Sequence, residues 1–202
     1  LRSINNILNH CKNVKHIIYL SSMAVYGKNI NKFIHEKTKI NHQSIYGKIK
    51  YKIEEICLDH AKKNGISLSV LRLPGVVGYG SKDNFISKTL HRIKLNQKII
   101  ATDPNSKFNN IITSEMLNHF IYKLIKKNSS IKYYTFGSKY PLKIKNVINY
   151  LYKLLEKKPN ISFIRSSKVS FIIKYSNAKK IGYKPITVKK SLISYVKSNS
   201  NN

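Results

Sequence analysis

Two short and almost continuously apolar runs constrain the fold most strongly: "KHIIYLSS" at 15–22 and "SLSVLRLP" at 67–74. Strands buried on both faces of a parallel sheet have this pattern, whereas half-exposed strands alternate apolar and polar residues. Between the two runs the sequence predicts a long helix at about 44–64, which Gly65 ends. A strand, a crossover helix and a second strand are the unit of a parallel sheet, so the sequence predicts an α/β fold.

The rest of the chain continues this alternation of strands and helices. Further helices are predicted at about 1–13, 84–95, 114–127 and 143–157, and further strands at 98–102, 109–113, 132–137 and 161–165. Two short helices near Ser176 and Thr187 follow, and we expect a disordered tail at 198–202. With 202 residues the chain is long enough for one domain with a hydrophobic core.

The composition is strongly basic, with 38 Lys and Arg against 8 Asp and Glu and a formal net charge of +30. Such a charge commonly indicates binding to nucleic acid or to an anionic membrane. Here, however, lysine accompanies abundant Ile, Asn and Tyr, as in proteins from AT-rich genomes, and only four residues are arginine. The lysines are spread over every segment, and no basic block with interleaved aromatic residues stands apart from the rest. We therefore expect salt-sensitive, non-specific adhesion to polyanions and no specific nucleic-acid partner.

The sequence shows no pattern of a metal site, a disulfide or a membrane span. Cys11 and Cys57 have neither CxxC spacing nor paired histidines, so we expect buried thiols in a reducing compartment and no metal. No apolar run approaches the ~18 residues of a membrane helix, and the first residues lack the pattern of a signal peptide. We expect a cytoplasmic protein without a membrane partner.

Tyrosine precedes lysine by four residues at three places: Tyr46/Lys50, Tyr122/Lys126 and Tyr175/Lys179. Residues four apart lie on one face of a helix, so each pair could act together. The chain has 14 tyrosines and many lysines, so this spacing alone does not separate a catalytic pair from a solvated helix face. The surroundings distinguish the first pair, because "SSMAVYG" (21–27) precedes it and "LRLPGVVGYG" (71–80) follows it.

In this order the motifs resemble the extended short-chain dehydrogenase/reductase superfamily, and within it the NAD-dependent epimerase/dehydratase family that acts on nucleotide sugars. That family has a strand ending in Ser-Ser or Ser-Thr before a Val-Tyr-Gly turn, then Tyr-x-x-x-Lys on a helix, then an arginine-containing strand running into Gly-x-x-Gly. Weaker similarity extends through "FNNII" (108–112), "YYTFGSKYPLKIKNVINYL" (133–151) and "SNAKKIGYKP" (176–185). The resemblance implies a Rossmann-type parallel sheet with flanking helices, a small C-terminal substrate lobe, and NAD or NADP as cofactor.

The resemblance also implies roles for individual residues. Tyr46 exchanges a proton with a sugar hydroxyl, Lys50 binds the nicotinamide ribose, and Ser22 bonds the reacting oxygen as the catalytic serine. Free tyrosine titrates near ~10, and a neighbouring ammonium favours the phenolate that such a role needs. Beside Tyr46 and Lys50, cofactor contacts are implied at Ser21, Pro74 and Val76.

One family feature does not occur in the sequence. The family opens with a strand, a Gly-x-x-Gly-x-x-Gly turn and a helix that binds the cofactor pyrophosphate. Because this turn is missing and the chain begins with Leu1, we expect an N-terminally truncated member that lacks the first βαβ units. In this interpretation 1–74 is the C-terminal part of the NAD(P)-binding Rossmann domain with the catalytic helix. Residues 75–197 are then the substrate lobe, interleaved with the remaining Rossmann elements.

Departures from family patterns reduce the number of family reactions that we expect this chain to catalyse. Dehydratases of the family have Asp-Glu after the catalytic threonine, where this chain has Met23 and Ala24. Galactose epimerases have a substrate-contacting asparagine where Gly75 stands, and a diphosphate-binding arginine in a region where this chain offers Lys107. We expect oxidation and re-reduction of a carbon of a sugar or nucleotide sugar, with net epimerisation, and leave a homodimer open. The alternatives are a one-way NAD(P)H-dependent sugar or ketone reductase, and a catalytically inactive fragment or polyanion-binding module.

Charged residues around the motifs are expected to have structural roles. Arg72 lies in a predicted buried strand and should have an ion or hydrogen-bond partner. Glu54 and Glu55 are expected to pair with nearby lysines, and Glu115 to lie in the first turn of a helix.

Overall fold

Three parallel strands form the main sheet in the computed structural model, which describes residues 2–10, 13–27, 32–127, 130–164 and 171–199. The strands lie in the order β1 (His16–Ser22), β3 (Ser67–Leu73) and β8 (Lys132–Thr135). The middle strand, β3, has five consecutive buried residues, as predicted for a strand inside a parallel sheet. β1 is only partly buried, which differs from the prediction. It is an edge strand in the described part of the chain, so one side of it lacks a covering neighbour.

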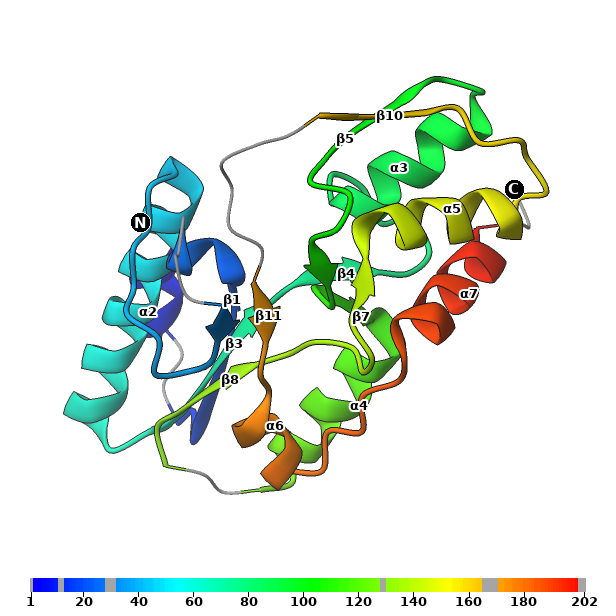
Figure 1. Cartoon of the computed structure of the whole chain (residues 1–202). Helices are drawn as coiled ribbons and strands as arrows, with labels where there is room; N and C mark the ends of the chain where they lie inside the picture. The colour runs from blue at the N-terminus through cyan, green and yellow to red at the C-terminus, as the bar shows by residue number, and fades with distance from the viewer. Residues whose placement is uncertain (1, 11–12, 28–31, 128–129, 165–170, 200–202) are drawn as a thin grey trace.

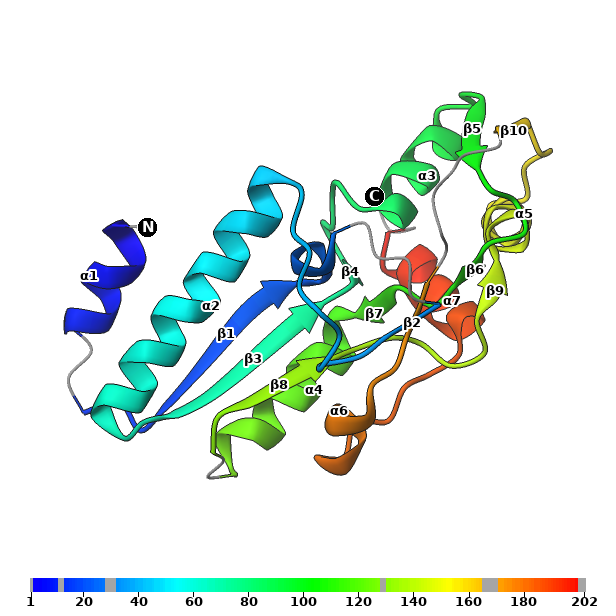
Figure 2. The same ribbon diagram turned by 60° about the vertical axis from the view of Figure 1, so that its left-hand side comes forward.

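Helices cover both faces of this sheet (Figures 1 and 2). On one face lies α2 (Ile45–Asn64), with α1 (Arg2–His10) packed beside it, and on the other lie α4 (Ser114–Ile125) and α6 (Ser176–Lys180). Leu68 and Val70 of β3 belong to the core under α1 and α2, whereas Leu71 packs into the core with α4. Parallel strands with helices on both faces confirm the predicted fold class.

A second group of helices lies beyond the carboxyl end of β3 (Figure 1) and holds a separate hydrophobic cluster. It is built by α3 (Phe85–Lys94), α5 (Ile144–Leu154) and α7 (Val188–Ser198). Short strand pairs surround and connect the two parts: β4 (Gly75–Val77) with β7 (Ile111–Thr113), β5 (Ile99–Thr102) with β10 (Ile161–Ile164), β6 (Lys107–Phe108) with β9 (Leu142–Lys143), and β2 (Phe33–Ile34) with β11 (Ile172–Ile173). All are parallel except the pair of β6 and β9.

The long helix α2 has the ends that the sequence predicts. The Ser44 hydroxyl accepts a hydrogen bond from the Gly47 amide at 3.0 Å, which caps the first turn. At the other end Gly65 has φ 64°, the left-handed conformation in which glycine commonly ends helices. Both ends are thus fixed by local chemistry, and α2 presents a defined first turn to the end of β1.

Some expectations need correction or lie outside the described residues. α7 includes Ser198, so this residue is helical instead of part of the predicted tail, while 200–202 and Cys11 lie outside the described ranges. Cys57 is buried, as predicted. Within the described residues no helix combines the length and apolar character needed to cross a membrane. The same residues contain no group of three or more His, Cys, Asp or Glu side chains that could hold a metal ion.

Candidate active site

The first two turns of α2 place Tyr46 and Lys50 on one face of the helix, beside the carboxyl end of β1. The Lys50 Nζ lies 5.7 Å from the centre of the Tyr46 ring and donates a hydrogen bond to the Leu20 carbonyl oxygen at 2.9 Å. The Tyr46 side chain is 56% exposed, so a ligand in solution can reach it. The predicted pair therefore consists of an ammonium fixed to β1 and an accessible phenol.

Ser22 is the last residue of β1 and the N-cap of a short 3-10 helix, η1 (Met23–Tyr26). Its Oγ accepts a hydrogen bond from the Ala24 amide at 3.2 Å. A hydroxyl that accepts in this way still carries its own hydrogen, which it can donate to another oxygen. The fold thus holds the third predicted catalytic side chain at the junction of β1 and η1.

Gly47, directly after Tyr46, brings α2 close to η1. A Cβ atom at this position would lie 2.5 Å from the carbonyl oxygen of Ala24, which belongs to the backbone and cannot swing away. The absence of a side chain therefore sets the distance between the two elements that bear Tyr46 and Ser22. The sequence interpretation missed this role, although Gly47 differs from Lys123 and Ser176, which follow the tyrosines of the other two Tyr-Lys spacings.

The predicted cofactor contacts lie at the same end of the sheet. Ser22 is paired in register with Leu73, so Pro74 follows β3 level with the end of β1. The Val76 carbonyl accepts a hydrogen bond from Asn84 Nδ2 at 3.1 Å. The Ser21 hydroxyl is buried and donates to Glu54 Oε1 at 2.5 Å, so only the main chain of Ser21 is available for the predicted cofactor contact.

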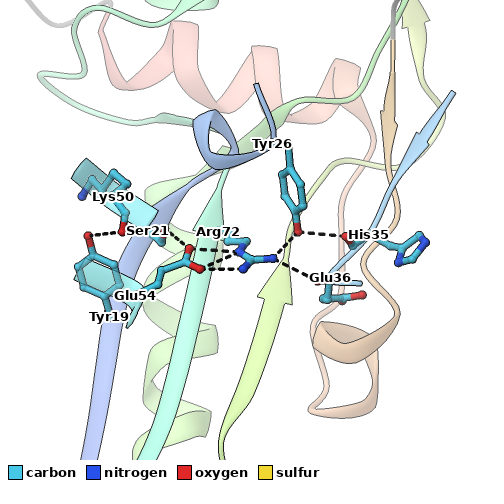
Figure 3. A network of polar contacts seen from close by, with 8 residues as sticks. All are labelled: Tyr19, Ser21, Tyr26, His35, Glu36, Lys50, Glu54 and Arg72. Atoms are coloured by element: carbon cyan, nitrogen blue, oxygen red, sulfur yellow. Dashed lines mark hydrogen bonds and ion pairs between the residues drawn. The ribbon is translucent and has the colours of Figure 1, made fainter. Parts of the chain in front are cut away.

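Glu54 does not pair with a lysine, so this expectation was wrong. It forms a buried ion pair with Arg72 of β3, in which Arg72 Nη2 donates to Glu54 Oε2 at 2.7 Å and Nε donates to both carboxylate oxygens (Figure 3). Only 1% of the Glu54 surface and 4% of the Arg72 surface is exposed. Arg72 therefore has the structural partner that its buried strand predicted, while exposed Glu55 pairs with Lys52 as expected.

Burial shifts the ionisation of the groups around this ion pair. It disfavours the Arg72 charge, but the bonds to Glu54 and Tyr26 outweigh this effect and raise the pKa of Arg72. Burial raises the pKa of Tyr26 to about 12, and burial together with Glu54 raises the pKa of Cys57 to about 11. Burial likewise raises the pKa of Tyr19. These phenols and the thiol are therefore neutral near pH 7.

The other two Tyr-Lys spacings have different surroundings. Lys126 lies over the Tyr122 ring, 4.3 Å from its centre, at the far end of α4. Tyr175 precedes the short helix α6 and packs edge-on against Tyr183 at 5.7 Å. Tyr46 and Lys50 differ from both pairs in that Lys50 is hydrogen-bonded to Leu20 of β1 in the main sheet. Position at the strand ends, and not the spacing, distinguishes Tyr46 and Lys50.

The described residues fit one end of a nicotinamide dinucleotide. Lys50 carries three N–H donors, one of which is bonded to Leu20, so two remain for ribose hydroxyls beside the exposed Tyr46. A pyrophosphate usually binds where a strand leads through a glycine-rich turn into a helix N-terminus. In the described ranges β1 instead leads into η1 and β3 into β4. The residues present thus offer donors for the ribose hydroxyls, and in the described ranges neither β1 nor β3 leads through such a turn into a helix that could bind the pyrophosphate.

Comparison with known proteins identifies the family of the chain. The model of the family described as "NAD dependent epimerase/dehydratase family" matches residues 2–128. A search of curated proteins finds no match.

Solved structures share the fold over the whole chain. The UDP-glucuronic acid 4-epimerase of Bacillus cereus in complex with NAD has a TM-score of 0.87 at 19% identity, over 100% of this chain and 67% of that one. The UDP-N-acetylglucosamine 4-epimerase of Methanobrevibacter ruminantium M1 in complex with UDP-N-acetylmuramic acid has the same TM-score and identity, over 100% and 68%. RMD of Pseudomonas aeruginosa complexed with NADPH has a TM-score of 0.81 at 21% identity, over 98% and 72%.

Proposed function

This chain belongs to the NAD dependent epimerase/dehydratase family, and from that premise we propose that it oxidises and re-reduces one carbon of a nucleotide sugar, with inversion at that carbon. The observation that carries the proposal is the arrangement at the carboxyl ends of β1 and β3. There α2 presents an exposed phenol and a fixed ammonium beside the serine that ends β1.

Each of the three side chains has a distinct task in this proposal. Tyr46 accepts the proton of a sugar hydroxyl and later returns it. Ser22 donates a hydrogen bond to the same oxygen and so orients it. Lys50 binds the ribose hydroxyls through the N–H donors that its bond to Leu20 leaves available. The bound nicotinamide supplies the acceptor and donor of hydride.

Inversion requires only that the oxidised sugar turns between the two hydride steps. After Tyr46 has taken the proton and the carbon has lost hydride, the carbon is a planar ketone. Return of hydride to its opposite face, and of the proton from Tyr46, gives the epimer. Atoms and electrons balance over the cycle, so the proposed reaction consumes no cofactor.

A cavity beside the second hydrophobic cluster supports a nucleotide sugar as the substrate class. It has a volume of about 330 Å³, with Phe85 and Phe108, whose ring centres are 5.5 Å apart, as apolar walls. Lys107, Thr102, Ser106 and the acidic residue Asp103 also line it. Aromatic and apolar walls suit a base, and a cation with hydroxyl donors suits a diphosphate.

The test compares Tyr46→Phe with Tyr122→Phe. Both tyrosines are about equally exposed, at 56% and 55%, and both are followed four residues later by a lysine, so Tyr122 is a matched control. Loss of a general acid–base typically costs about 10²- to 10⁴-fold, so we expect Tyr46→Phe to lower kcat by that factor and Tyr122→Phe to leave it unchanged. The assay follows reduced nicotinamide and the epimerised sugar with UDP-sugars as substrates.

The outcomes distinguish the proposed epimerisation from a one-way reduction and from the absence of hydride transfer. Equal activity of wild type and Tyr46→Phe would remove Tyr46 from the reaction. Stoichiometric consumption of NADPH, with the Tyr46 dependence retained, would show a one-way reductase. Absence of hydride transfer in the wild type, with NAD and with NADP, would contradict the proposed function as a whole.

A further inference from the structure

We propose that the buried Glu54–Arg72 pair is a positioning device that fixes the Tyr46–Lys50 face of α2 relative to Ser22 of β1. The inference rests on the proposed function of these three side chains and adds two residues that contact neither substrate nor cofactor. The arrangement that carries it is a chain of hydrogen bonds from Ser21 through Glu54 and Arg72 to Tyr26 (Figure 3), with Lys50 bonded separately to Leu20 of β1.

Glu54 continues the catalytic face of α2. It follows Lys50 by four residues and Tyr46 by eight, so the three side chains lie in one row along the helix. Lys50 donates to the Leu20 carbonyl at 2.9 Å, and Glu54 accepts from the Ser21 hydroxyl at 2.5 Å. Two successive turns of α2 are thereby bonded to two successive residues of β1, immediately before Ser22. A slide of the helix along the strand would break both bonds.

Arg72 also forms hydrogen bonds on the opposite side of the site from β1. Its Nη1 donates to the Tyr26 hydroxyl at 2.8 Å and to the Glu36 carbonyl at 3.1 Å. The Tyr26 hydroxyl in turn donates to the His35 carbonyl at 3.0 Å. Tyr26 is the last residue of η1, whose first turn is capped by Ser22. Arg72 therefore links the Glu54 carboxylate on α2 to Tyr26 at the end of η1. It also links this carboxylate to Glu36, in the loop that leads toward α2.

The planar guanidinium is what makes this arrangement possible. Arg72 donates to a carboxylate on one edge and to a hydroxyl and a carbonyl on the other. The Arg72 Cζ also lies 4.7 Å from the centre of the Tyr133 ring and 5.1 Å from that of Tyr26. A lysine ammonium has three donors on a flexible stem and cannot hold the same partners in one plane.

A role in geometry explains the pair better than a role in stability alone. Buried ion pairs are often no more stabilising than apolar residues of similar volume, because both charges lose their hydration. Transfer of a proton and a hydride requires the reacting groups to be held within about 0.5 Å, and misplacement by about 1 Å can cost roughly 100-fold in rate. A network bonded to β1, η1 and α2 at once supplies this restraint.

The test uses three variants and one matched control in the full chain. Glu54→Gln removes the buried charge, Arg72→Lys keeps the charge but loses the planar fork, and Ser21→Ala removes only the hydroxyl that links β1 to Glu54. Glu55→Gln removes the same charge from the neighbouring, exposed residue, which pairs with Lys52. For each protein we would measure the thermal midpoint, kcat, KM, and the NMR shift of the Tyr46 ring carbons, assigned by their loss in Tyr46→Phe.

Positioning predicts a specific pattern. In Glu54→Gln and Arg72→Lys, kcat should fall roughly 10- to 100-fold with KM changed by less than about 3-fold, and the Tyr46 ring shift should move. Ser21→Ala should also lower kcat and move the Tyr46 ring shift, in the same directions but by smaller amounts. Glu55→Gln should leave kcat and the Tyr46 ring shift at their wild-type values.

A purely structural role gives a different pattern. The thermal midpoints would fall while the folded variants kept wild-type kcat and an unmoved Tyr46 ring shift, and this would overturn the inference. If Glu54→Gln does not fold, Ser21→Ala and Arg72→Lys decide by the same criterion. The NMR readout needs no substrate, so a wild type without hydride transfer would contradict the proposed function, and the Tyr46 shift would still test the positioning.

Discussion

Arg72 illustrates how one side chain can have a role that neighbouring residue types cannot fill. The chain has 38 basic residues, of which four are arginine, and one of these four is buried at the centre of the main sheet. Its five N–H donors in a fixed plane allow it to bind a carboxylate, a phenol and a carbonyl together. Substitution by the far more abundant lysine would keep the charge and lose the geometry.

Replacement of Gly47 by alanine tests a second single-residue constraint. Alanine in a helix interior is favoured over glycine by about 1 kcal/mol, but overpacking typically costs about 1–3 kcal/mol. Since the new Cβ would meet the Ala24 carbonyl oxygen at 2.5 Å, the clash should prevail. We expect Gly47→Ala to lower the free energy of unfolding in urea by up to about 2 kcal/mol and to lower kcat.

The neighbouring residue supplies the control for this substitution. Lys48→Ala changes an exposed side chain on the same turn and should alter the free energy of unfolding by no more than about 0.5 kcal/mol. An increase in stability of Gly47→Ala, as helix propensity alone predicts, would show that η1 moves aside to admit the methyl group.

The candidate site could be predicted from sequence where its residues lie in ordered motifs. Tyr46, Lys50 and Ser22 are predicted as site residues because the ordered motifs around them resemble the family, and their roles stay a prediction. The partner of Glu54 was assigned wrongly, because a lysine-rich helix offers many cations nearby in sequence, whereas the actual partner lies 18 residues away on β3. A buried arginine in a chain with 8 acidic residues was the signal that could have identified the pair.

At the scale of elements, the prediction succeeded where local chemistry fixes the ends. The α2 boundaries follow from Ser44 and Gly65, and the α4 start from the Thr113 cap, whose Oγ accepts from the Met116 amide. The strands β2, β4 and β6, of two or three residues each, were not predicted. They exist because tertiary contacts bring short segments together, and their sequences contain too few residues to show an alternating pattern.

At the scale of the whole molecule, charge opposes folding. A formal net charge of +30 on 202 residues produces repulsion that compact structure increases. The buried Arg72–Glu54 pair is neutral overall and shielded from solvent ions, so salt should act on the exposed lysines instead.

We therefore expect the thermal midpoint to rise when sodium chloride is added. The Debye length falls from about 30 Å at 0.01 M to about 10 Å at 0.1 M, which weakens repulsion between distant surface charges. Calorimetry at increasing salt measures the effect. Sodium sulfate at equal ionic strength is the control: a rise with sulfate and none with chloride would indicate an effect specific to sulfate, such as its exclusion from the protein surface, in place of screening, and a fall with both would contradict the expectation.

The exposed edge of β1 has a consequence for the rate at which its amide hydrogens exchange with solvent. Successive N–H groups of a strand point to opposite sides. Those of β1 directed at β3 are held in the ladder, and those directed outward meet no strand in the described part of the chain. Deuterium uptake along His16–Ser22 should therefore alternate between slow and fast residues, and uniformly slow uptake would reveal a further strand beside the one that carries Ser22.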